Sequence, residues 1–201
     1  MKKIMFNDQF GLTQAVLEGR KTQTRRIING LPSNTGGVEI IVSIISHREY
    51  DEQNLLLAVH TTDCLGKTMN IPYQVGEEVA IAQKYSELEY GVDWVRHLIN
   101  KEHAGWSNKL FVSAEEMPHR ISITNIRVER LQDISDEDML KEGLSHIETK
   151  WGYWEEVRES LKFYSYETKR KAFSALIDKV SGKGTWNSNP WVFVYEFELV
   201  K

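Results

Sequence analysis

The chain has 201 residues, 41% of them hydrophobic, which is enough for one well-buried domain but short for two independent ones. Its formal net charge of −4 excludes a polycation that binds nucleic acid through bulk charge, so a nucleic-acid site could only be a local patch. A single cysteine, Cys64, excludes an internal disulfide, and no signal-peptide core or membrane-spanning apolar run is present. We therefore expect a soluble cytoplasmic protein with no membrane partner.

The N-terminal part of the chain predicts a strand and then a helix. The strand covers residues 3–6, and apolar residues recur at helical spacing over about 8–18. Asp8 is the expected N-cap of this helix and Gly19 suits its C′ position. A basic segment, residues 20–26, follows directly.

Strands dominate the middle of the chain. Alternating apolar residues predict strands over 38–45, 55–60 and 120–131. The apolar parity of the last strand changes along its length, which predicts a β-bulge near residues 124–125. Residues 84–119 have an irregular pattern typical of a long excursion.

The C-terminal part predicts three helical segments and a final strand. Ser135 is expected to cap a short helix over 135–142, and residues 154–164 and 172–180 each place apolar side chains on one helical face. The strand over 191–199 has one strongly aromatic parity, which we expect to face the core. Scattered strands with short helices between them favour one mixed or closed sheet decorated by helices.

The basic segment is the clearest candidate for a ligand site. Its cations and hydroxyls are Arg20, Lys21, Arg25, Arg26, Thr22 and Thr24. Arginine forks bind phosphate or carboxylate at two points, and threonine hydroxyls add neutral donors, so the segment suits an anionic or nucleotide ligand. The alternative is a solvated helix end whose cations complement the helix dipole.

This segment resembles the G-x-K-T/S signature of ASCH domains, which belong to the PUA-like superfamily. Its matching residues are Gly19, Arg20, Lys21, Thr22, Thr24 and Arg25. Further resemblance to the longer bacterial and prophage ASCH proteins lies at 72–77, 117–134 and 189–197. The resemblance implies an α+β fold: a PUA-like β-barrel of mixed strands decorated with short helices. The whole chain, 1–201, would be one domain with insertions at about 30–70 and 84–115.

The resemblance also implies ligands and a possible reaction. ASCH domains are expected to bind RNA or nucleotides in a cleft near the signature. One bacterial branch hydrolyses N4-acetylcytidine with a lysine, a threonine and a glutamate, to which Lys21, Thr24 and Glu142 correspond here. That branch has about half this length, so the insertions here could reshape or cover the pocket.

Weaker candidates lie elsewhere. His119 and Arg120 stand at the entry of the strand over 120–131, and Trp106 and Trp186 could stack on a base, although aromatic residues more often pack in cores. The histidines show no metal-ligand spacing, so we predict no metal and no cofactor. Three functions stay open: an RNA- or modified-nucleotide-binding module, an amidohydrolase acting on an acylated nucleoside, and a phage-associated interaction protein whose barrel is only a scaffold.

Overall fold

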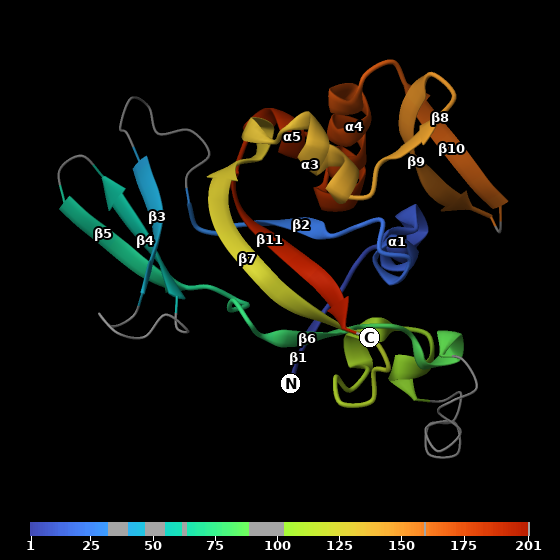
Figure 1. Ribbon diagram of the computed structural model, residues 1–201, viewed down its shortest axis with the longest axis horizontal. Coiled ribbons are helices and arrows are strands. Elements are labelled where there is room, and N and C mark those ends of the chain that lie inside the picture. Colours follow the sequence, from blue (N-terminus) through green and yellow to red (C-terminus); the bar gives the residue numbers. More distant parts are fainter. Residues whose placement is uncertain (32–39, 47–54, 62–63, 89–102, 159, 201) are drawn as a thin grey trace.

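The computed structural model describes residues 1–31, 40–46, 55–61, 64–88, 103–158 and 160–200 (Figure 1). It has a mixed α+β architecture in which strands predominate and the helices are short and few. No helix within these ranges is long and apolar enough to cross a membrane.

The central sheet contains five strands. Their order is β1 (Lys2–Ile4), β6 (Glu78–Ile81), β7 (Arg120–Arg130), β11 (Trp191–Val200) and β2 (Gln23–Ile27). β1 and β6 run parallel, and the other neighbours are antiparallel. β2, which begins within the basic segment, therefore forms one edge of the sheet, and β1 forms the other.

The segment that follows β1 contacts the opposite side of this sheet. Arg26 on β2 donates from Nη2 to the carbonyl of Met5, the residue after β1. Phe6 then packs on Phe197 of β11, with ring centroids 5.7 Å apart. β1 and β2 share no ladder in the described residues, so only contacts made by the segment after β1 bridge toward β2 and β11.

The β-bulge predicted in β7 is confirmed. Asn125 lies opposite Glu196, whereas Ile123 lies opposite Phe197, so Thr124 is an extra residue in the ladder. A strand with an extra residue bends and twists more strongly, which contributes to the curvature of the sheet.

Both faces of the first half of β11 are buried. The aromatic parity lies in the core as predicted, with Tyr195 fully buried, but Val192 and Val194 on the opposite parity are buried too. Helices α3 (Asp136–Lys141), α4 (Lys169–Ser181) and α5 (Thr185–Ser188) cover one face of the sheet, which explains why both faces of β11 are apolar over residues 192–195, before Glu196 and Glu198 (Figure 1).

The helix predicted over 154–164 is wrong. These residues belong to an antiparallel hairpin of β9 (Lys150–Val157) and β10 (Ser160–Tyr166), which β8 (Ser145–Ile147) extends to three strands. Aromatic residues meet directly across the hairpin, for example Trp154 opposite Phe163. Such cross-strand pairs stabilise sheets, and they outweigh the helical spacing of the same residues.

The first helix also differs from the prediction. Asp8 is not its N-cap, because a 3₁₀ turn over Asp8–Phe10 precedes α1 (Leu12–Leu17). Gly11 separates the two with a φ of +62°, a backbone conformation that glycine adopts readily. Gly19 ends the helix as predicted, with a φ of +73°.

The two regions interpreted as insertions lie outside the central sheet. The first contains a separate antiparallel sheet beside β7, made of β3 (Ile40–Ser46), β4 (Leu55–Thr61) and β5 (Cys64–Asn70) (Figure 1). The described part of the second, residues 84–88 and 103–115, contributes to a small second core around Tyr85. Its remaining residues lie outside the described ranges.

Candidate functional site

A pocket of about 330 Å³ lies between β2, α4 and the segment that follows β1. The three residues that resemble a catalytic set, Lys21, Thr24 and Glu142, all line it. We call it the triad pocket. Its remaining lining residues are Met5, Phe6, Asn7, Leu12, Arg25, Arg26, Ile27, Phe173, Leu176, Ile177, Val180 and Ser181.

Lys21 is held in place by the turn between α1 and β2. Its backbone N–H donates to the Ala15 carbonyl at 2.9 Å, and the next residue, Thr22, donates from its own N–H to the Lys141 carbonyl at 3.0 Å. These bonds tie the start of β2 both to α1 and to α3. The Lys21 side chain is only 2% exposed and points into the interior.

The Lys21 ammonium makes three hydrogen bonds. Its Nζ donates to the Glu142 carboxylate at 2.7 Å, and at 2.8 Å to each of the Glu142 and Gln23 carbonyls. The pKa of Lys21 is nevertheless lowered, because burial disfavours the charged form. The Glu142 carboxylate opposes this shift, whereas Arg26 and Arg25 add to it.

Glu142 reaches the pocket from the end of α3. Ser135 caps this helix as predicted, accepting from the Asp138 N–H at 3.1 Å, and Gly143 follows Glu142 with a φ of +103°. A Cβ on Gly143 would lie 3.2 Å from Leu12 Cδ2 and 3.6 Å from Lys21 Cδ. Glycine here therefore satisfies the backbone and leaves room for the lysine.

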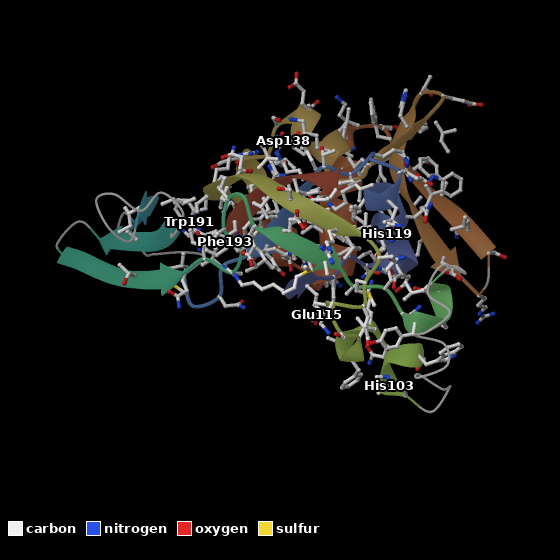
Figure 2. The ribbon with its side chains drawn as sticks, turned by 60° about the horizontal axis from the view of Figure 1, so that its bottom comes forward. His103, Glu115, His119, Asp138, Trp191 and Phe193 are labelled. Atoms are coloured by element: carbon white, nitrogen blue, oxygen red, sulfur yellow. The ribbon has the colours of Figure 1, made fainter. Side chains whose placement is uncertain are left out.

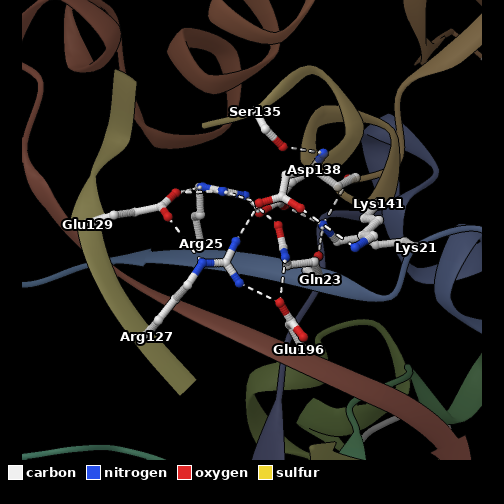
Figure 3. A network of polar contacts seen from close by, with 10 residues as sticks. Lys21, Gln23, Arg25, Arg127, Glu129, Ser135, Asp138, Lys141 and Glu196 are labelled. Carbon is white, nitrogen blue, oxygen red and sulfur yellow. Dashed lines mark hydrogen bonds and ion pairs between the residues drawn. The ribbon is translucent and has the colours of Figure 1, made fainter. Parts of the chain in front are cut away.

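Arg25 is part of a buried ionic network and not of a surface patch (Figure 3). Its guanidinium bonds to the carboxylates of Glu129 at 2.6 Å, Glu142 at 2.9 Å and Asp138 at 3.2 Å, and also to the Gln23 amide. The pKa of Arg25 is raised: burial acts to lower it, but Glu142 and Glu129 outweigh that effect.

The positive patch expected from the sequence is therefore neutralised. In the network around Arg25, cations and carboxylates match in number: Lys21, Arg25, Arg127 and Lys141 face Glu129, Asp138, Glu142 and Glu196. Arg20 is exposed outside the triad pocket and pairs with Glu18. The expectation that Arg20 and Arg25 offer free charges to a phosphate is corrected by these ion pairs.

Arg26 is the exception in the basic segment. Its guanidinium lies over the Phe6 ring, 5.7 Å from the centroid, and Nη2 donates to the Met5 carbonyl. Its Nε is buried without a hydrogen-bond partner, and no described carboxylate forms an ion pair with it. Burial lowers its pKa. A cation that lines the triad pocket thus has no ion-pair partner among the described residues, although the charge of Glu142 attracts it.

The two threonines of the segment have different surroundings. Thr24 lies on β2 opposite Tyr195, is buried in the wall of the triad pocket, and has a hydroxyl to which no other described residue hydrogen-bonds. Thr22 does not line the pocket, and its carbonyl accepts from the Phe197 N–H at 3.0 Å. Of the two, only Thr24 presents a hydroxyl to a ligand in this pocket.

His119 and Arg120 lie far from the triad pocket. They precede and begin β7, whereas α3 follows the opposite end of this strand, and Figure 2 shows His119 well separated from Asp138. The His119 ring bonds to Gln83 at 2.8 Å, and Arg120 approaches Glu78 at 3.6 Å. Neither residue joins the site with Lys21.

The two tryptophan candidates are half-buried and pack against hydrophobic clusters. Trp106 lies against the small second core, and Trp186 on α5 meets the Phe173 ring edge-on with centroids 6.0 Å apart. Neither lines the triad pocket. Among the described residues there is also no cluster of histidine, cysteine or carboxylate side chains that could hold a metal.

Sequence reasoning missed two parts of the site. The apolar face of α4 forms one wall of the pocket through Phe173, Leu176 and Ile177, although its helical spacing indicated core packing alone. Glu129 and Asp138, which neutralise Arg25, lie more than 100 positions from it in the chain, so no local pattern could pair them.

No protein-family model, curated protein or solved structure matches this chain.

Proposed function

We propose that this protein is an amidohydrolase that removes the acyl group from an acylated nucleoside of the N4-acetylcytidine type, on a PUA-like barrel of the ASCH kind. One observation carries the proposal: Lys21, Thr24 and Glu142 line a single pocket, and the Lys21 ammonium lies 2.7 Å from the Glu142 carboxylate. The resemblance to ASCH domains suggests the class of substrate, and the pocket supports the proposal through the arrangement of these three side chains.

Thr24 is the nucleophile in this proposal. A threonine hydroxyl attacks a carbonyl only when a base takes its proton. Burial lowers the pKa of Lys21, so its ammonium loses a proton more easily than that of an exposed lysine and the neutral amine becomes accessible. The neutral Lys21 amine is then the base for Thr24.

The reaction proceeds in two balanced steps. Thr24 Oγ bonds to the acyl carbon as Lys21 accepts the hydroxyl proton. The amide C–N bond between the acyl group and the nucleobase then breaks, and Lys21 delivers the proton to the leaving amine of the nucleobase. This leaves an acyl-Thr24 ester. Water then attacks the ester, which releases the carboxylic acid and restores the Thr24 hydroxyl.

The walls of the pocket suit a single nucleoside. Its volume of about 330 Å³ lies within the range of small-molecule sites. One wall is polar, with Lys21, Thr24 and Glu142, and the other is the apolar face of α4, on which a base and a short acyl group can pack. A strand of RNA could place only one nucleoside here.

A second candidate function is binding of a modified nucleotide without chemistry. The observation that favours it is the triple hydrogen bonding of Lys21, whose Nζ faces three acceptors. This environment stabilises an ammonium, and an ammonium cannot accept the proton of Thr24. In this alternative Lys21 only holds Glu142 and the start of β2 together.

Release of cytidine from N4-acetylcytidine by the purified protein distinguishes the two. The hydrolase predicts release that is linear in enzyme concentration and lost in Thr24→Val, a variant of nearly equal shape. A matched control is Thr124→Val, which changes an exposed hydroxyl in the β7 bulge. Release no faster than in buffer, from a folded wild-type protein that binds the nucleoside, would leave binding as the function.

A further inference from the structure

Arg25 and Arg26 are neighbours on β2 with opposite electrostatic surroundings. Arg25 has carboxylate partners on three sides, whereas Arg26 has the Met5 carbonyl and the Phe6 ring and forms no ion pair with a described residue. Side chains alternate along a strand, so the two guanidinium groups leave β2 on opposite faces. The ion pairs of the carboxylate network therefore include Arg25 but not Arg26, although the charge of Glu142 still attracts Arg26.

Arg26 is half-buried, and a guanidinium whose Nε is shut off from water without an ion-pair partner is costly. Removing a cation from water is unfavourable unless an anion or several acceptors replace the lost hydration. One carbonyl and one aromatic face replace it only in part, and the buried Nε has no acceptor at all. A ligand anion would supply what is missing.

Arg26 also lies where two hollows meet. A second hollow of about 420 Å³, here called the outer hollow, adjoins the triad pocket. The two share Met5, Phe6, Asn7, Arg26 and Val180. The outer hollow also contains Lys109, whose ammonium is already paired with Asp8 at 2.7 Å. A ligand seated in the triad pocket would thus pass Arg26 on its way out.

We propose that Arg26 binds a phosphate group of the ligand, so that the substrate is an acylated nucleotide and not a free nucleoside. The acyl end lies at Thr24 and the phosphate lies at Arg26, at the mouth toward the outer hollow. The planar guanidinium matches phosphate oxygens in a two-point geometry. The phosphate belongs either to a mononucleotide or to one residue of an RNA strand. The position of the acyl end rests on the proposed function, whereas the phosphate contact does not.

Binding of unreactive ligands tests this contact. Dissociation constants for cytidine, cytidine 5′-monophosphate and a cytidine trinucleotide are measured by calorimetry on wild type, Arg26→Gln and Arg158→Gln. Arg158 is a matched control, because it is an exposed arginine in the turn between β9 and β10. Wild type and Arg158→Gln are expected to prefer the monophosphate over cytidine by about ten- to a hundredfold, the range of a charge-assisted hydrogen bond.

Arg26→Gln is expected to lose this preference and to bind cytidine and its monophosphate with equal affinity. A trinucleotide that binds more tightly than the monophosphate, in an Arg26-dependent way, identifies an RNA strand as the source of the phosphate; equal binding identifies a mononucleotide. Equal affinity of wild type for cytidine and its monophosphate overturns the proposal. So does a preference that survives in Arg26→Gln.

Pyrophosphate separates this inference from the proposed function, because it needs no nucleoside site. Pyrophosphate is expected to raise the melting temperature of wild type and not that of Arg26→Gln. The increase in Arg26→Lys should be intermediate, because lysine keeps the charge but cannot bind phosphate at two points. Far-ultraviolet circular dichroism checks that each variant is folded. An Arg26-dependent pyrophosphate effect without cytidine release sustains the anion site and rejects the hydrolase. Cytidine release without an Arg26-dependent pyrophosphate effect sustains the hydrolase and rejects the anion site.

Discussion

Lys21 and Glu142 are 121 positions apart in the chain, yet the lysine ammonium lies 2.7 Å from the carboxylate, and a glycine in the left-handed region stands next to each segment. Gly19 ends α1 two residues before Lys21, and Gly143 ends α3 directly after Glu142. The two helix ends thus place a buried ion pair in the wall of the triad pocket.

Removing Glu142 is predicted to destabilise the protein more than removing Lys21. Glu142→Leu leaves Lys21 buried with two carbonyls and takes one carboxylate from Arg25, which should cost about 3–5 kcal/mol. In Lys21→Met the Glu142 carboxylate still bonds to Arg25, so the cost should be smaller. Urea denaturation followed by circular dichroism measures both. Equal losses would show that the pair is not coupled to Arg25.

The lowered pKa of Lys21 predicts a stability that increases with pH. Below the pKa of Lys21 in the folded chain, both the folded and the unfolded chain hold the proton. In that range the lysine does not change how the free energy of unfolding varies with pH. Between that pKa and about 10.5, the unfolded chain holds a proton that the folded chain has released. The free energy of unfolding contributed by this group therefore rises with pH in this window. The difference between wild type and Lys21→Met, measured at several pH values, should show this rise; a flat difference would contradict it.

Tyr195 predicts that the free energy of unfolding decreases with pH above pH 10, the opposite of the effect of Lys21. Burial raises the pKa of its phenol well above the usual value of 10, so the folded chain keeps a proton that the unfolded chain loses. Stability is then fully present below pH 10 and is lost as the pH rises further. Tyr195→Phe should flatten this decline, as measured by urea denaturation between pH 8 and 11. A decline of unchanged steepness in the variant would assign it to another group.

Local signals predicted the elements that carry the site. Ser135, Gly19 and the bulge at Thr124 were predictable because each reflects the chemistry or parity of a few adjacent residues. The same short-range logic failed for residues 154–164, where helical spacing coincides with residues that favour strands. Only the partner strand β10, with Phe163 opposite Trp154, decides between the two structures.

The convergence of Lys21, Thr24 and Glu142 on one pocket was predictable, but the electrostatic environment of that pocket was not. The signature placed Lys21 and Thr24 in one segment, and the structure brings Glu142 to the same pocket. The fate of Arg25 and Arg26 was not predictable, because their surroundings depend on residues more than 100 positions from Arg25 and on the curvature that brings Met5 to Arg26. Composition alone treated the two arginines as equivalent.

Thr24 allows the sharpest test of the chemistry. Thr24→Val keeps the shape of the side chain and removes the hydroxyl, so it should lower the rate of cytidine release from N4-acetylcytidine by at least about 10³-fold. Since the hydroxyl bonds to no other described residue, its loss should leave the urea midpoint nearly unchanged. Thr24→Ser keeps a hydroxyl and should retain part of the activity.

The acyl intermediate gives a second, independent readout of the same residue. If Thr24 attacks the acyl carbon, brief reaction with N4-acetylcytidine followed by acid quench should yield protein heavier by one acetyl group, attached at Thr24. Because Lys21 is the base for the attack, Lys21→Met should accumulate no such adduct even though Thr24 is present. Intact-protein mass spectrometry and peptide mapping measure both. An acetyl group found on Lys21 instead would make the lysine the nucleophile and overturn the assignment of Thr24. Turnover without any adduct in a rapidly quenched wild-type sample would favour direct attack by water.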